Sequence, residues 1–136
     1  MRILLAGILL TGSTALAQGN FTTAAEVRPI MDMTKTSWIA VREWDGNDLV
    51  YFTHIESWRC GMEKVRYGIN TAIADQEYEL EDCHEEMLTP NAMTLEDHLP
   101  YIVQPLGSVE TVTIKIFYDD GSVDGATFNR NGSIIP

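Results

Sequence analysis

The sequence is poor in cysteine and in basic residues, and it lacks the motifs of several common enzyme classes. Two of the 136 residues are cysteines, and 9 are Lys or Arg against 20 Asp or Glu. It has no phosphate-binding glycine loop, dinucleotide fingerprint or nucleophile in a glycine-flanked turn. Nucleic acid and anionic lipid both require basic patches on a protein partner. We therefore expect no nucleic-acid binding and no cofactor.

The sequence also lacks an apolar run of the roughly 20 residues that a membrane-spanning helix requires. The apolar residues 3–10 follow Arg2 and precede small residues that end at Ala17. This pattern is typical of a secretory signal peptide, here residues 1–17. We predict a periplasmic or secreted protein that is not inserted in the membrane after the leader is removed. A cytosolic protein with an apolar first helix is the alternative, and it fits the polar residues after Ala17 less well.

No repeat, low-complexity linker or second apolar run divides residues 18–136. Removal of 17 of the 136 residues leaves 119, which suits one domain with a modest core. The remaining 8 basic and 20 acidic residues give a formal charge of −12. Such a charge favours a basic protein as partner, or it only keeps the protein soluble. The oligomeric state is not predicted by these features.

The two cysteines, Cys60 and Cys83, predict one disulfide bond, because paired cysteines in exported proteins usually form bridges. In the chain-entropy model, a loop of this length contributes about 3 kcal/mol. Two alternatives are open. A redox pair normally has the spacing Cys-x-x-Cys, and a metal site that includes His84 would lack a fourth ligand at a familiar spacing.

The bridge also predicts how two strands pair. If the two cysteines face each other across an antiparallel pair, opposite residues have numbers that sum to 143. Lys64 then lies opposite Glu79, and Arg66 lies opposite Glu77, which gives two opposite-charge pairs on one face. The other face is apolar, as in a sheet with one buried face. Residues 70–75 would form the connecting loop.

The remaining elements follow from local patterns. Thr23 and Glu26 form a capping box that predicts a helix to about Lys35. Two β-rich runs, residues 37–44 and 49–58, flank a Gly/Asn/Asp turn and predict a hairpin. The elements before the first cysteine are therefore a helix and a hairpin.

A second hairpin is predicted between residues 108 and 130, where apolar residues alternate with Thr113 and Lys115 before the sequence DDGS turns the chain. Before it, three prolines argue against long regular structure, and Thr94 can cap a short helical turn over residues 95–99. We predict an α+β domain with an N-terminal helix packed on an antiparallel sheet of about six strands. A small β-barrel-like domain is the alternative.

Histidines give one group of candidate functional residues. His54 and Glu56 would share one face of a strand, as a general base and its orienting carboxylate require. His84 lies beside acidic residues and is a candidate metal ligand. Neither group has a nucleophile or a familiar metal-binding spacing, and a polar strand face or a solvated loop explains both more simply.

Acidic and aromatic residues give the other candidates. Residues 75–86 hold seven carboxylates and no Lys or Arg. Within them, Glu77, Glu79 and Glu81 would form an acidic strand face for a basic partner, although a solvated, partly salt-paired face explains the run as well. Candidate binding residues on the first hairpin strand are Trp38, Arg42 and Trp44. Exposed Trp and Arg are common at binding hot spots, but Trp in a small domain usually fills the core.

The segments TAAEVRPIM, SWIAVREWDGNDLVYFTHIESWRCG and VRYGIN resemble small, exported, single-disulfide proteins of Gram-negative bacteria that carry no assigned activity. The resemblance covers most of the chain after the leader. It implies a bacterial, periplasmic protein and supplies no catalytic residues.

We predict a non-enzymatic binding, inhibitor or accessory module whose partner is a basic protein or a cell-wall polymer. The alternative is a small envelope hydrolase or metal-dependent enzyme. Such an enzyme would use His54 with Glu56, or His84 with its acidic neighbours.

Overall fold

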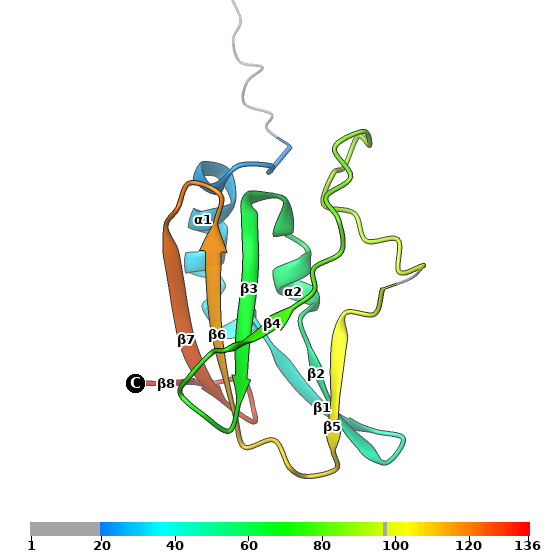
Figure 1. The fold of residues 1–136 in the computed structure, drawn as a ribbon, viewed down its shortest axis with the longest axis vertical. Coiled ribbons are helices and arrows are strands. Elements are labelled where there is room, and N and C mark those ends of the chain that lie inside the picture. The colour runs from blue at the N-terminus through cyan, green and yellow to red at the C-terminus, as the bar shows by residue number, and fades with distance from the viewer. Residues whose placement is uncertain (1–19, 97) are drawn as a thin grey trace, which may run out of the picture.

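The computed structural model describes residues 20–96 and 98–136. The predicted signal peptide lies outside the described residues. Within them, eight strands form two antiparallel sheets, accompanied by two α-helices and two short 3-10 helices (Figure 1). No helix in this part of the chain is both long enough and apolar enough to cross a membrane. The α+β class is therefore confirmed, and the sheets do not close into a barrel.

The predicted N-terminal helix is α1, Ala24–Met33. Its N-cap forms as expected, because the Thr23 side chain accepts a hydrogen bond from the backbone N–H of Glu26 and donates one to the Glu26 carboxylate at 2.9 Å. The Glu26 carboxylate reaches back to the backbone N–H of Thr22, one residue before the position of the standard capping box. The helix ends two residues before the predicted Lys35, which begins the 3-10 helix η2, Lys35–Ser37. One apolar face of α1 enters the core.

The first predicted hairpin is also confirmed. Strands β1, Ala40–Trp44, and β2, Asn47–Tyr51, are joined by the two-residue turn Asp45-Gly46. Both turn residues have positive φ angles, 52° and 77°, the combination that twists two strands into a tight hairpin. A third strand, β5, Tyr101–Pro105, completes the sheet in the order β1-β2-β5.

The larger sheet has five strands in the order β4-β3-β6-β7-β8. Its strands are β3 (Met62–Ile69), β4 (Gln76–Tyr78), β6 (Thr111–Tyr118), β7 (Val123–Asn129) and β8 (Ile134–Ile135). Strands β6 and β7 are the second predicted hairpin. In the view of Figure 1, α1 lies behind this sheet.

The predicted register of β3 and β4 is confirmed, because Arg66 lies opposite Glu77. The residue numbers of the two flanking pairs also sum to 143, as predicted. The ladder ends at Tyr78, so Lys64 and Glu79 lie beyond it. The predicted ion pairs are absent: neither Lys64 nor Arg66 pairs with a carboxylate among the described residues. The backbone register is therefore right and the charge pairing is wrong.

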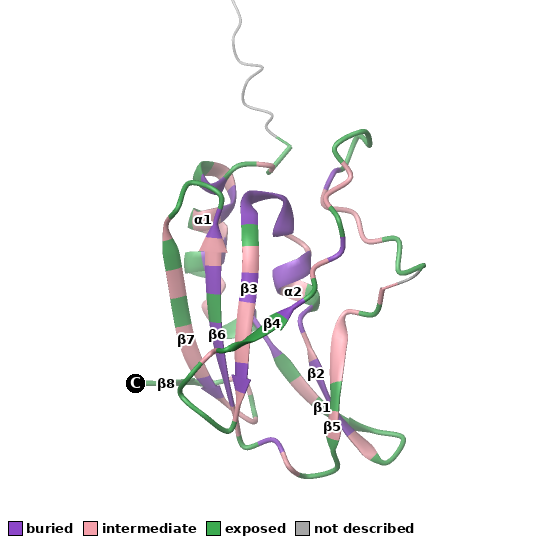
Figure 2. Cartoon of the chain, viewed as in Figure 1, coloured by how far each residue is buried: buried purple, intermediate pink, exposed green. Residues whose placement is uncertain are grey.

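The core lies between the inner face of the five-stranded sheet and the segments that cover it, and it appears as the buried stretches in Figure 2. Its largest members are fully buried aromatic residues: Trp38, Phe52, Tyr118 and Phe128. The Trp38 indole N–H donates to the carbonyl of Met31 in α1 at 3.0 Å. This bond attaches the helix to the start of the hairpin.

An ion pair joins strand β2 to Arg130, the residue that follows β7. Asp48 of β2 is fully buried and receives two hydrogen bonds from the Arg130 guanidinium, at 2.6 and 2.9 Å. It also accepts the backbone N–H groups of Gly107 and Val109. The hydrogen bonds from Arg130 hold the pKa of Asp48 well below its ordinary value, against the opposing effect of burial.

Four features of the secondary structure differ from the prediction. Residues 53–58 were expected to continue the second strand of the first hairpin, but Thr53–Glu56 form helix α2, and the 3-10 helix η3 (Arg59–Gly61) follows it. The proline-bounded β5 was not expected, and no helical turn forms over the described part of residues 95–99. The single sheet of about six strands is two sheets with eight strands.

Candidate functional site: an acidic groove beside the disulfide

The predicted disulfide is confirmed. Cys60 and Cys83 are bonded, with their Cα atoms 5.2 Å apart. Cys60 lies in η3 rather than in a strand, so the bridge ties this short helix to the segment that follows β4. The bond fixes where residues 79–83 run after they leave the sheet.

Arg59, next to the bridge, is buried, with 1% of its side chain exposed. Its guanidinium donates to five backbone carbonyl oxygens at 2.7–3.3 Å. These carbonyls belong to Glu56, Glu81, Asp82, Asn91 and Ala92. One planar cation therefore joins α2 to two loop segments that are distant in the sequence.

Glu56 is fully buried beside this arginine. Its carboxylate accepts the Tyr78 hydroxyl at 2.7 Å and the backbone N–H of Glu81 at 2.9 Å, and it also contacts Nε2 of His98. Burial raises the pKa of Tyr78, and the hydrogen bond to Glu56 raises it further. Tyr78 therefore remains a hydrogen-bond donor across the physiological pH range.

Glu81 is a second nearly buried carboxylate. It accepts from the backbone N–H of Thr94 and contacts Nε2 of His84 at 2.6 Å, and the Arg59 guanidinium lies 3.5 Å away. Burial, the largest single influence, raises its pKa. The contact with His84, the backbone hydrogen bonds and the charge of Arg59 outweigh burial and lower the pKa of Glu81 from 4.5 to about 2. Glu81 thus anchors the loop as an anion.

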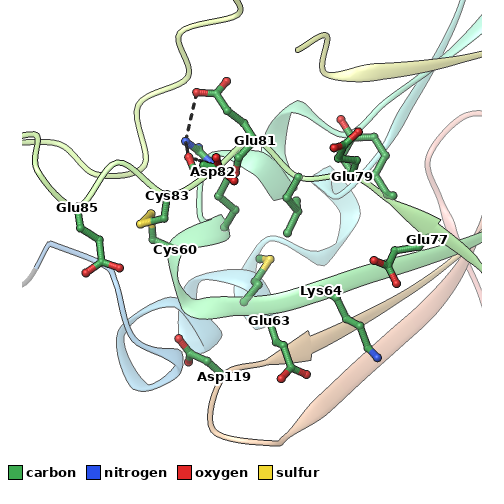
Figure 3. Close-up of a pocket in the computed structure, with 14 residues that line it drawn as sticks. Cys60, Glu63, Lys64, Glu77, Glu79, Glu81, Asp82, Cys83, Glu85 and Asp119 are labelled. Atoms are coloured by element: carbon green, nitrogen blue, oxygen red, sulfur yellow. Dashed lines mark hydrogen bonds and ion pairs between the residues drawn. A yellow bond between two sulfur atoms is a disulfide. The ribbon is translucent and has the colours of Figure 1, made fainter. Parts of the chain in front are cut away.

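The β3–β4 ladder ends at the pair Val65–Tyr78, while the disulfide closes the two chains again further on. Between these points the chains leave a groove of about 480 Å³ (Figure 3). Six exposed carboxylates line it: Glu63, Glu77, Glu79, Asp82, Glu85 and Asp119. None of the six forms an ion pair with another described residue. Lys64 also lines the groove without forming an ion pair, so the groove is a concave surface with an excess of negative charge.

A smaller hollow of about 350 Å³ lies on the other side of the same segment and is lined by His84 and His98. Each imidazole contacts a buried carboxylate, Glu81 or Glu56, which can orient it as a general base. The hydroxyl of Thr94, also in the lining, is within 3.3 Å of Glu81. Among the described residues, no group of three or more His, Cys, Asp or Glu is arranged to hold a metal ion.

The predicted pairing of His54 with Glu56 is wrong, because α2 replaces the strand on which they would share a face. The His54 ring contacts the Thr34 hydroxyl at 2.8 Å, and burial lowers the pKa of His54. Glu56 instead lies with His98, which the sequence reasoning did not select.

The predicted aromatic and acidic binding residues lie partly in the core and partly on the surface. Trp38 is in the core, whereas Trp44 is 57% exposed with the Arg42 guanidinium 4.4 Å from its ring centroid. Glu77 and Glu79 line the groove with exposed side chains, while Glu81 is buried in the network beneath. The structure therefore brings two of the three predicted acidic residues to one surface.

Sequence reasoning missed Arg59 and His98. Positions 52, 55, 56 and 59 have helical spacing, but Glu56 and Arg59 are charged, so the apolar pattern of the sequence did not indicate that Arg59 is buried. No local signal identified His98, which lies 42 residues from Glu56.

The resemblance to exported single-disulfide proteins of Gram-negative bacteria is supported only by the single disulfide. Comparisons of this chain with protein-family models, curated proteins and solved structures found no match.

Proposed function

We propose that this protein is an exported, non-enzymatic binding module whose acidic groove receives a basic segment of a partner protein. The observation that carries the proposal is the set of six exposed, unpaired carboxylates around one concave surface. Like charges held close together raise the free energy of the unliganded protein, and Lys or Arg side chains of a ligand would relieve that repulsion. The acidic surface as a whole would also speed the encounter with a basic partner.

The groove has a rigid wall. The disulfide and the buried Arg59 fix residues 79–83, which carry two of the six carboxylates, Glu79 and Asp82. A binding surface that is already ordered loses less conformational entropy when a ligand binds. The disulfide also suits an oxidising compartment, as a periplasmic or secreted location requires. A cell-wall polymer is a weaker proposal, because Trp44 is the one exposed member of the predicted tryptophan pair.

The hollow between His84 and His98 supports a second candidate function, general-base catalysis on an envelope polymer. Two imidazoles with orienting carboxylates favour it. Its lining includes one hydroxyl, that of Thr94, which already contacts Glu81, and it includes no Ser or Cys. Hydrolysis of envelope polymers that is lost in both His84→Gln and His98→Gln would support this function instead.

Two triple variants with equal charge test the proposed groove. The groove variant carries Glu63→Gln, Glu77→Gln and Glu79→Gln, while the control carries Asp32→Asn, Asp45→Asn and Glu110→Gln at exposed positions outside the groove. Calorimetric titration with a peptide of alternating Lys and Ala measures affinity at low and high salt. We expect the groove variant to bind about tenfold more weakly, a difference of about 1.4 kcal/mol, and the control to change less than about twofold. Equal weakening in both variants would show that only net charge matters, and absence of binding to the unmodified protein would refute the proposal.

A further inference from the structure

The basic residues of this acidic chain are unevenly distributed. Of the eight in the described part, three surround the half-buried ring of Phe117. Lys64, Lys115 and Arg66 place their charged groups 4.8, 5.3 and 5.7 Å from its centroid. In the sheet register, Lys64 lies opposite Phe117 and Arg66 opposite Lys115, so all four side chains share the outward face of β3 and β6.

This arrangement breaks a rule of strand pairing. Like charges directly opposite each other destabilise a sheet, and the pair Arg66–Lys115 is of this kind. Glu77 lies opposite Arg66 on its other side, yet neither it nor any other described carboxylate forms an ion pair with the three cations. Lys35, Arg59 and Arg130 each form an ion pair with a carboxylate. Among the other described basic residues, Arg28 and Arg42 form none. The Phe117 ring attracts the three cations but does not neutralise their charge. A local conflict that no ion pair neutralises is typical of a functional site.

A hollow of about 530 Å³ adjoins the cations on the same face. Lys115 stands at its edge, and its walls include the apolar side chains of Ile73 and Val123, which are 65% and 41% exposed. The loop that carries Ile73 crosses directly over Gly68, where a Cβ atom would lie 2.1 Å from the Ile73 carbonyl oxygen. The hydroxyl of Thr113 donates to the carbonyl of Thr71 at 2.7 Å and holds this loop in place.

We propose that this face binds a small amphipathic carboxylate. Its anionic group lies among Lys115, Arg66 and Lys64, and its apolar body lies in the hollow against Ile73 and Val123. A hydrated inorganic anion would leave the apolar walls exposed, and a neutral apolar ligand would leave the cations uncompensated. The site is separate from the acidic groove and takes a ligand of opposite charge, although Lys64 lies at the boundary between them.

Calorimetric titration with octanoate tests the proposal, with acetate and 1-octanol as matched ligands that lack the tail or the charge. We expect octanoate to bind at one site and both matched ligands to bind at least tenfold more weakly. Lys115→Gln should weaken octanoate binding about tenfold, since it removes a charge-assisted contact. Arg42→Gln, the same charge change on the other sheet, should alter it less than about twofold.

A stability measurement separates a binding role of Lys115 from a structural one. Without ligand, Lys115→Gln should unfold at the same or a higher temperature, because it removes the repulsion from Arg66. Octanoate should raise the unfolding temperature of the unmodified protein by more than that of the variant at the same concentration. Three results would each overturn the proposal: no binding of octanoate, equal binding of 1-octanol, or a Lys115→Gln variant that is less stable yet binds octanoate normally.

Discussion

At the scale of single residues, Arg59 determines the shape of the candidate site. Its guanidinium contacts five carbonyls in three segments of chain, and no water reaches it because the side chain is 1% exposed. Lysine has the same charge but three donors and no planar fork. A lysine at position 59 would leave some of the buried carbonyl oxygens without a donor, and each unpaired carbonyl would lower the stability of the folded protein.

We therefore expect Arg59→Lys to lower the free energy of unfolding by about 3 kcal/mol. The exposed Arg42, changed to Lys, serves as the control and should cost less than about 0.5 kcal/mol. Urea unfolding of both variants measures the difference. A loss of under about 1 kcal/mol for Arg59→Lys would mean that the network of carbonyls does not hold the loops together.

Glu77 offers a second test at this scale, because it lies between the two proposed sites. It lines the acidic groove and also lies opposite Arg66. Glu77→Gln should weaken binding of the basic peptide and strengthen binding of octanoate, each by about two- to fivefold, as expected for one exposed charge. Titrations of one protein preparation with both ligands compare the two effects. A change in the same direction for both ligands would contradict the separation of the sites.

At the scale of elements, the sequence predicts best what neighbouring residues determine. The N-cap of α1, the Asp45-Gly46 turn and the β6–β7 hairpin each depend on a few adjacent residues, and all were predicted. Helix α2 was missed because its β-branched Thr53 and Ile55, next to Phe52, favour a strand locally, while burial at helical spacing decides the outcome. Strand β5 was missed because nearby prolines argue, in the sequence alone, against regular structure. These prolines lie at the two ends of the strand and remove no hydrogen bond from its interior.

In the candidate site, too, the sequence predicted what neighbouring residues determine and missed what tertiary contacts determine. The disulfide, Glu77 and Glu79 belong to a contiguous pattern, and all were selected from the sequence. Glu63 and Asp119 enter the groove through tertiary structure: a register shift separates Met62 from Lys64, and the Asp119 N–H donates to the Gly61 carbonyl. No pattern of adjacent residues indicates such a contact between distant segments.

Removal of the disulfide tests how residues 79–94 are held in place. Replacement of both Cys60 and Cys83 by serine should lower the free energy of unfolding by about 3 kcal/mol in the chain-entropy model. Amide hydrogen exchange should quicken in residues 79–94, which the bridge positions, more than in β6 and β7. Exchange that becomes faster throughout the protein, or that does not become faster in residues 79–94, would show that the bridge does not shape the groove locally.

At the scale of the whole molecule, buried carboxylates make the stability depend on pH. The pKa of Asp48 is lowered by Arg130, and that of Glu81 is lowered to about 2 despite burial. A group with a lowered pKa in the folded state contributes stability above its unfolded pKa, and this contribution is lost as the pH falls through the folded value.

The free energy of unfolding should therefore decrease slightly as the pH falls from 7 to about 5, because the pKa of His54 is lowered in the folded state, and fall steeply between about pH 4.5 and 2. Urea unfolding at several pH values measures this profile. Asp48→Asn should be less stable at pH 7. Its free energy of unfolding should decrease less steeply at low pH, because the variant lacks the Asp48 carboxylate that takes up a proton on unfolding. An unmodified protein that gains stability below pH 4 would contradict the account.

The central claim is that the groove beside the disulfide binds a basic segment. Titration of the isotope-labelled protein with the Lys-Ala peptide, followed by two-dimensional NMR, locates the contact directly. We predict that the largest saturable amide shifts fall in residues 62–64, 77–85 and 119, with little change in β1, β2 and β5. Shifts spread evenly over the acidic surface, or concentrated away from the groove, would contradict the claim.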